Sequence, residues 1–197
     1  MRKITLSASP AVQQSLLVLL ASLPFLRLVY LGLYDGLGAN PIEFITRSTG
    51  TWALVFLCAT LSITPLRQIT QQPFLLPWRR TLGLASFSYA LCHFVIWFWL
   101  DHGWSWSTMV VDVLERPFIT MGFLSFVMML PLAISSNTWA MRTLGRSWKK
   151  LHRLIYVIAI TVILHYFWHK SGKQDFFEVS LYALFIGWLL LTRIVRR

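Results

Sequence analysis

Long apolar stretches, separated by short polar segments, follow one another along the whole chain. A helix needs about 20 mostly apolar residues to cross a hydrocarbon core of about 30 Å. Six stretches have this length and character, and they cover residues 11–32, 48–65, 81–100, 117–135, 152–169 and 176–193. The pattern therefore predicts an all-α fold, an integral membrane bundle of six transmembrane helices.

Local signals suggest where two of these helices begin and end. Hydroxyl groups at Ser48 and Thr49 can cap free N–H groups, so we expect the second helix to begin there and to stop before Pro65. Pro117 stands where a first-turn proline is tolerated. Six spans leave no room for a soluble catalytic domain, so we expect residues 1–197 to form one domain. We see no internal repeat in the sequence.

The basic residues predict the orientation, because cytoplasmic loops carry an excess of lysine and arginine. With the N-terminus in the cytoplasm, thirteen of the 18 basic residues fall on the cytoplasmic side, four fall outside, and Arg27 lies within the first span. All seven acidic residues also fall outside. Both termini are therefore predicted to be cytoplasmic. The thirteen are Arg2, Lys3, Arg67, Arg79, Arg80, Arg142, Arg146, Lys149, Lys150, Arg153, Arg193, Arg196 and Arg197.

Composition supports the membrane assignment. The chain is 56% hydrophobic and 13% charged, its mean hydropathy is +0.62, and average soluble domains are about 25% charged. These values exclude disorder and argue against a water-soluble globule. Two cysteines exclude a disulfide scaffold. We attribute the net charge of +11 to topology and to contact with anionic lipid, and expect no nucleic-acid partner.

Two histidines lie deep inside apolar stretches, where ionisable residues usually mark function. His93 is 13 residues after Arg80, and His165 is 12 residues after Arg153. Both therefore lie about 20 Å along the helix from the cytoplasmic basic residues. Two imidazoles at one depth on parallel helices are what a bis-histidine haem needs. The alternative is two unrelated core histidines, each bonded to a backbone carbonyl.

The other histidines give weaker signals. His152 precedes His165 by 13 residues, about 20 Å along a helix, so it suits a second haem in the inner leaflet. The matching position on the third span is Arg79, which we interpret as a propionate partner rather than a ligand. On a straight helix His152 and His165 would point about 140° apart. His102 and His169 are interpreted as solvated surface residues.

Arg27 lies in the outer half of the first span. Two interpretations stay open for it. It can pair with a propionate of the outer haem, or its long side chain can reach the outer interface. A group of tryptophans at the outer end of the third span is typical of an interfacial aromatic belt; these are Trp97, Trp99, Trp104 and Trp106.

Several motifs resemble those of the MsrQ family (formerly YedZ), the haem-binding membrane subunits of bacterial periplasmic methionine-sulfoxide reductase systems. This family belongs to the ferric-reductase-like transmembrane group. The resemblance covers about residues 38–170. The matching segments are Gly50-Thr51-Trp52-Ala53-Leu54, Thr64-Pro65-Leu66-Arg67, Arg79-Arg80-Thr81-Leu82-Gly83-Leu84, Tyr89-Ala90-Leu91-Cys92-His93, Arg116-Pro117-Phe118-Ile119-Thr120-Met121-Gly122-Phe123, and Leu144 to Tyr156, ending at His165.

The resemblance implies a b-type haem held by His93, His152 and His165. Relatives with four histidines hold two haems; here Arg79 stands in place of the fourth histidine, so one haem or two stay open. The family is a non-catalytic electron-transfer subunit of the bacterial inner membrane. It passes electrons from quinol to a periplasmic molybdopterin-containing reductase that repairs oxidised methionines, and a flavin, FMN, has also been associated with it.

Two functions from different classes follow. The first is electron transfer, with electrons from the quinone pool or a separate flavin reductase, and with acidic outer loops facing the periplasmic partner. The second is a small membrane transporter whose histidines relay protons or bind substrate. A transporter predicts acidic residues within the spans, and none falls in a span core, which favours electron transfer. The outer acids are Asp101, Asp112, Glu115, Asp175 and Glu178.

Overall fold

The computed structural model describes residues 9–172 and 174–195, and all regular structure in this part of the chain is helical. The all-α prediction is therefore confirmed. The elements are α1 (Pro10–Leu33), α2 (Pro41–Thr70), α3 (Leu75–Ile96), a π-helical turn (Trp97–Asp101), α4 (Trp106–Glu115), α5 (Pro117–Ile134), α6 (Thr138–Leu144), α7 (Arg146–Leu151), α8 (Leu154–Ser171) and α9 (Phe177–Val195).

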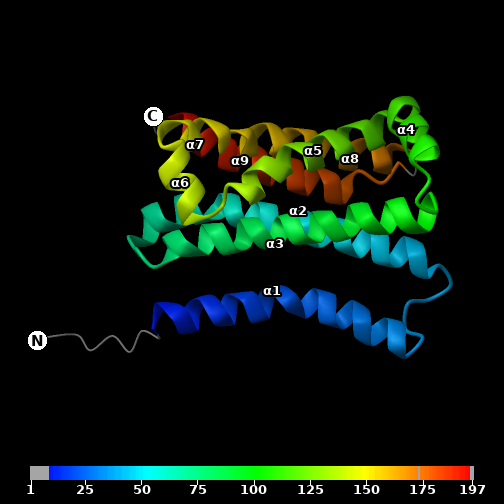
Figure 1. Cartoon of the computed structure of the whole chain (residues 1–197), viewed down its shortest axis with the longest axis horizontal. Coiled ribbons are helices and arrows are strands. Elements are labelled where there is room, and N and C mark those ends of the chain that lie inside the picture. Colours follow the sequence, from blue (N-terminus) through cyan, green and yellow to red (C-terminus); the bar gives the residue numbers. More distant parts are fainter. Residues whose placement is uncertain (1–8, 173, 196–197) are drawn as a thin grey trace, which may run out of the picture.

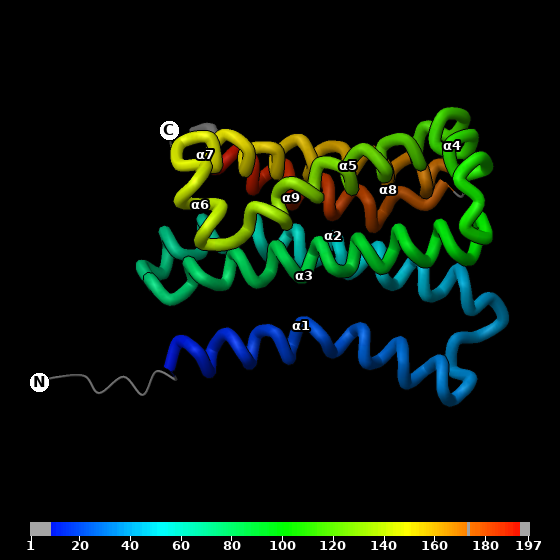
Figure 2. The backbone as a smooth tube through the Cα atoms, viewed as in Figure 1, coloured from blue at the N-terminus to red at the C-terminus, as the bar shows by residue number. Residues whose placement is uncertain are grey.

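The long helices run side by side and form three layers (Figure 1). Helix α1 is one layer, the α2–α3 hairpin is the middle layer, and α5, α8 and α9 form the third. Helix α4 lies at one end of the bundle and α6 and α7 lie at the other, as the tube in Figure 2 also shows. The start of α1 and the end of α9 share the α6–α7 end. We call this end inner and the α4 end outer, following the predicted orientation.

Five helical segments of the described chain are long and apolar enough to cross a membrane. They match the first five predicted spans. The sixth predicted stretch forms α9, whose last side chains lie outside the described residues. A sixth crossing and two cytoplasmic termini therefore stay predictions. Of the charges used for the orientation, Arg2, Lys3, Lys173, Arg196 and Arg197 also lie outside the described residues.

Helix α2 is longer at both ends than predicted. It begins after Asn40, whose side chain caps the N–H of Glu43, so the expected start at Ser48 and Thr49 is wrong. It also continues through Pro65 to Thr70. A proline inside a helix leaves the carbonyl four residues earlier without its partner. Here that carbonyl belongs to Leu61 and accepts a hydrogen bond from Arg193 Nη2 at 2.7 Å, which satisfies the freed acceptor.

The chain is not a straight helix between the two histidines of the fifth predicted span. Helix α7 ends at Leu151 and α8 begins at Leu154, so His152 and Arg153 form a turn between them. The 140° separation expected for His152 and His165 on one straight helix therefore does not apply. Near the outer end of α3, the π-helical turn carries Trp99, which is 54% exposed. That exposure agrees with the predicted aromatic belt.

Helix α1 is fixed to the middle layer by a tyrosine of α3. The Tyr89 hydroxyl donates to the carbonyl of Ala21 at 2.8 Å and accepts from the N–H of Phe25 at 2.9 Å. It is therefore inserted into a helical hydrogen bond of α1, next to Pro24. Inserted side chains and prolines are both recognised causes of helix bending.

Candidate functional site

The structure brings His93 and His165 together, as their equal predicted depth requires. His93 lies on α3 and His165 on α8, and the centroids of their rings are 6.2 Å apart with an angle of 77° between the ring planes. Both residues are partly buried. The chain therefore places two imidazoles opposite each other between two different helices.

Each of the two rings has one nitrogen bonded to a backbone carbonyl. His93 Nδ1 lies 2.8 Å from the carbonyl oxygen of Thr46, and His165 Nδ1 lies 2.6 Å from that of Phe118. A carbonyl only accepts, so Nδ1 of each ring must carry the proton and donate. Nε2 is then the nitrogen with the free lone pair. Histidines that bind metal are commonly held in this way through the opposite ring nitrogen.

A glycine of the neighbouring helix lets each ring approach its carbonyl. A Cβ atom added at Gly50 would lie 3.1 Å from both Cε1 and Nδ1 of His93. A Cβ atom added at Gly122 would lie 2.7 Å from Nδ1 of His165. Any side chain at Gly122 would thus displace the ring, and a side chain at Gly50 would crowd it.

The same contact occurs in two helix pairs, α2–α3 and α5–α8, and its residues have the same spacing along the sequence in both. The carbonyl residue precedes its histidine by 47 positions in both pairs, as the contacts of His93 with Thr46 and of His165 with Phe118 show. The glycine follows the carbonyl residue by four positions in both. From the sequence alone these four residues had no assigned role, although Gly50, Phe118 and Gly122 lie in segments that resemble the family. The repeated glycine-to-histidine spacing of 43 positions is the signal that could have revealed them.

The surroundings of the pair are aromatic and apolar. The ring of Phe118 lies 6.1 Å from His165 and 5.8 Å from His169. Nearby on α3, Phe94 stacks on Phe126 of α5 with ring centroids 4.6 Å apart. An imidazole nitrogen binds a metal at about 2 Å, so a ring separation of 6.2 Å leaves room for one metal atom between the rings. The two imidazole donors therefore fit the iron of a haem.

His152 lies apart from this pair and is held differently. It is in the turn before α8, and His165 is eleven residues after the first residue of α8, about 16 Å of helical rise. Its Nε2 lies 3.1 Å from the hydroxyl of Ser135. Its ring stacks on Trp148 at 3.9 Å, and the Trp148 indole donates to the Ser135 carbonyl at 2.9 Å. The structure does not bring His152 to the other two histidines.

The two arginines predicted to face propionates lie in different environments. Arg79 lines a cavity of about 180 Å³ together with Arg193. Arg27 is exposed, and its guanidinium carbon lies 5.9 Å from the ring centroid of Phe44 on α2. This contact is one that an arginine reaching the outer interface can make. Its pairing with a propionate stays a prediction.

His102 is not the solvated surface residue that we expected. Its side chain is only 11% exposed, its Nε2 lies 3.2 Å from Asp112, and its ring packs edge-on against Trp97 at 4.6 Å. Asp112 is itself buried and also pairs with Arg116 Nε at 2.7 Å. Asp112 therefore holds the outer loop together, and the expectation that it faces a partner is wrong.

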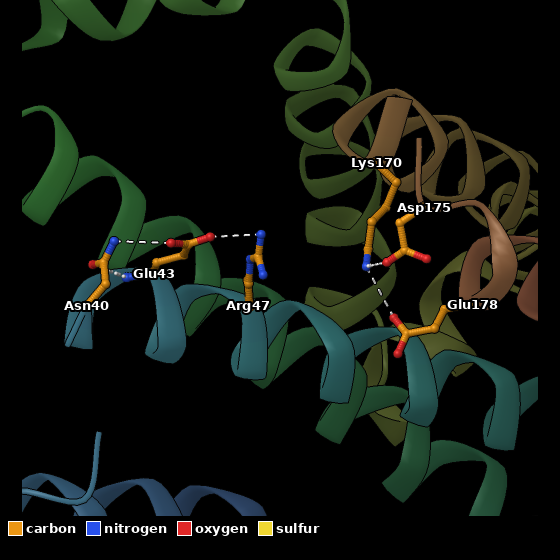
Figure 3. Close-up of polar contacts among 6 residues, drawn as sticks. All are labelled: Asn40, Glu43, Arg47, Lys170, Asp175 and Glu178. Carbon is orange, nitrogen blue, oxygen red and sulfur yellow. Dashed lines mark hydrogen bonds and ion pairs between the residues drawn. The ribbon is translucent and has the colours of Figure 1, made fainter. Parts of the chain in front are cut away.

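Ion pairs also engage other outer acids (Figure 3). Lys170 lies 2.7 Å from Asp175 and 3.4 Å from Glu178. The hydrogen bond from Lys170 holds the pKa of Asp175 below its usual value. On α2, Glu43 pairs with Arg47 at 2.7 Å. The outer surface is thus less negative than its acids alone suggest. Two further acids, Asp101 and Glu115, are exposed.

Comparison with known proteins places these residues in a family. The family described as "Ferric reductase like transmembrane component" matches residues 49–163. A protein of Ralstonia nicotianae is 55% identical over 89% of this chain and 82% of its own length, and one of Bordetella pertussis is 52% identical over 88% and 86%. A protein of Herminiimonas arsenicoxydans is 50% identical over 92% and 84%. All three are named "Protein-methionine-sulfoxide reductase heme-binding subunit MsrQ". No solved structure matches the chain.

Proposed function

Since the chain belongs to the ferric-reductase-like transmembrane components and, among them, to the MsrQ haem-binding subunits, we propose that His93 and His165 are the two axial ligands of its b-type haem. The chain is a multi-pass inner-membrane subunit that transfers electrons for a methionine-sulfoxide reductase. The observation that carries the proposal is the facing pair of imidazoles, each with Nδ1 bonded to a carbonyl.

The chain's own residues fix the geometry and the environment of the site. The carbonyls of Thr46 and Phe118 hold each ring in one tautomer and one orientation, which also makes Nε2 a better donor. Gly50 and Gly122 allow those rings to lie against the neighbouring helices. The phenylalanine rings around them make the surroundings apolar, and an apolar environment is one way in which a protein tunes a haem. Haem, when bound, supplies a one-electron redox couple.

We propose that the chain binds one haem in total. In the inner half, His152 holds no iron in the arrangement seen. Its Nε2 is engaged by Ser135, and its ring is stacked on Trp148. A second haem, as in four-histidine relatives, would need His152 to leave Ser135. Arg79 is the inner residue that we assign to an anionic group.

We further propose the route on either side of the membrane. Electrons enter from quinol in the quinone pool or from a separate flavin reductase, with FMN as a further cofactor. They leave to a periplasmic molybdopterin-containing methionine-sulfoxide reductase that repairs oxidised proteins. The partner is supported by the printed names of the relatives. Exposed charges chiefly steer association, so Asp101 and Glu115 are the outer acids available for it.

Haem content of purified variants tests this proposal. His93→Ala and His165→Ala should each abolish or severely reduce the same reduced-minus-oxidised component, because each removes one of two axial ligands. His169→Ala is the matched control, since it lies one turn further along α8, is exposed and contacts Phe118. Full haem content in both single variants would contradict the proposal.

A further inference from the structure

A second site, which is polar, lies at the inner end of the bundle, where α2, α3, α8 and α9 meet. It is a cavity of about 180 Å³. Its walls contain two arginines and several hydroxyl and amide groups but none of the seven acidic residues of the chain. The lining residues are Thr64, Pro65, Gln68, Arg79, Tyr156, Thr192 and Arg193.

Arg193 is fixed in this cavity by contacts that use only part of its guanidinium group. Nη2 donates to the Leu61 carbonyl that Pro65 leaves free. The guanidinium carbon lies 5.3 Å from the ring centroid of Tyr156. Nε and Nη1 are buried and have no hydrogen-bond partner among the described residues. Buried donors of a charged group are costly when they are left without an acceptor.

Arg79 adds a second positive charge to the same space. The two guanidinium groups repel each other, and Tyr156 is their polar neighbour on α8. Two like charges in a partly buried setting cost free energy unless an anion compensates them. Arginine is also the residue best suited to bidentate contacts with carboxylate or phosphate oxygens.

We propose that Arg79 and Arg193 bind one oxyanion, a carboxylate or phosphate group, which accepts hydrogen bonds from Arg193 Nε and Nη1. The cavity volume admits such a group but not a macrocycle, so any larger ligand inserts only its anionic end. The hydroxyls of Thr64 and Tyr156 provide further donors. This site stands independently of the haem ligands proposed above, because it uses none of their residues.

Two sources can supply the oxyanion: soluble phosphate or the phosphate of a lipid headgroup. Purified wild type, Arg193→Gln, Arg79→Gln and the control Arg80→Gln are compared. Arg80 adjoins Arg79 on α3 but is exposed and does not line the cavity. Arg79→Gln keeps the Arg193–Leu61 hydrogen bond, so it remains informative if Arg193→Gln fails to fold.

Each source has its own measurement. If soluble phosphate binds, sodium phosphate at constant ionic strength raises the thermal midpoint of wild type and Arg80→Gln, and the affinity falls about tenfold or more in the cavity variants. If a lipid binds, native mass spectrometry finds a phospholipid on wild type and Arg80→Gln that the cavity variants lose. Identical behaviour of all four proteins in both measurements would overturn the proposal.

Discussion

The outer and inner halves of the bundle hold their histidines in opposite ways. In the outer half, His93 and His165 direct Nδ1 to carbonyls and leave Nε2 for a ligand bond. In the inner half, Nε2 of His152 is the nitrogen that is engaged, by the hydroxyl of Ser135. Depth in the membrane marked His93 and His165 as candidates, and the spacing of His152 from His165 together with the family resemblance added the third. The ring nitrogen that makes the hydrogen bond distinguishes a ready ligand from a packed side chain.

Charge distinguishes the two halves as well. The outer pair sits among phenylalanines, while the inner end carries two arginines and no acidic residue in its cavity. An apolar pocket with two imidazoles suits a buried redox centre, and a cationic cavity suits an anion. The inner half is therefore suited to binding an anion by charge, whereas the outer half is suited to ligating iron through two imidazoles.

The largest effect is expected from filling the space beside the outer rings. Gly122→Val should abolish most haem binding, because even a Cβ there lies 2.7 Å from Nδ1 of His165. Gly50→Val should have a smaller effect, since its nearest contacts are 3.1 Å. Haem-to-protein ratios measure both. Gly187→Ala on α9, with nothing within 4 Å of its added Cβ, is the control, and haem retention in Gly122→Val would show that the close contact is irrelevant.

The next effect sharpens the contrast between the halves. His152→Ala should leave the spectral component of the outer pair intact, because Nε2 of His152 is bonded to Ser135 and holds no iron. The lost hydrogen bond to Ser135 should lower stability by about 1 kcal/mol. Low-temperature reduced spectra and thermal unfolding test the two parts separately. Disappearance of all haem from this variant would reverse our assignment of the two regions.

A moderate effect is expected at the outer surface. Asp101→Asn combined with Glu115→Gln should slow electron delivery and weaken its salt dependence without removing haem, because both side chains are exposed. The reference is Asp112→Asn, which should instead destabilise the outer loop, since Asp112 is buried between His102 and Arg116. Unchanged rates at every ionic strength in the double variant would rule out steering by these acids.

The smallest effect concerns pH. Lys170 lowers the pKa of Asp175 in the folded protein, so this pair contributes stability above the unfolded pKa of aspartate, about 3.9, and loses it as pH falls through the lower folded pKa. Asp175→Asn should lower the thermal midpoint slightly at pH 7 and by less near pH 3. An equal decrease at both pH values would exclude the ion pair as the cause.

Apolar run lengths were enough to predict the long helices but not the short α4, α6 and α7. Equal depth was enough to pair His93 with His165. The end of α2 was not predictable, because the tolerance of Pro65 depends on Arg193, which lies on the last helix. The turn at His152 was likewise hidden, since nothing in its neighbours forbids a continuous helix. The roles of Gly50 and Gly122 depend on contacts between helices, which only their equal spacing to the histidines indicates.

The central claim is that a single haem has His93 and His165 as its two axial ligands. The most direct measurement is the electron paramagnetic resonance spectrum of the oxidised protein, together with a haem count, for wild type and the three histidine-to-alanine variants. We predict a low-spin bis-histidine signal in wild type and His152→Ala, and its loss in His93→Ala and His165→Ala. A signal that survives in His165→Ala and vanishes in His152→Ala would contradict the account.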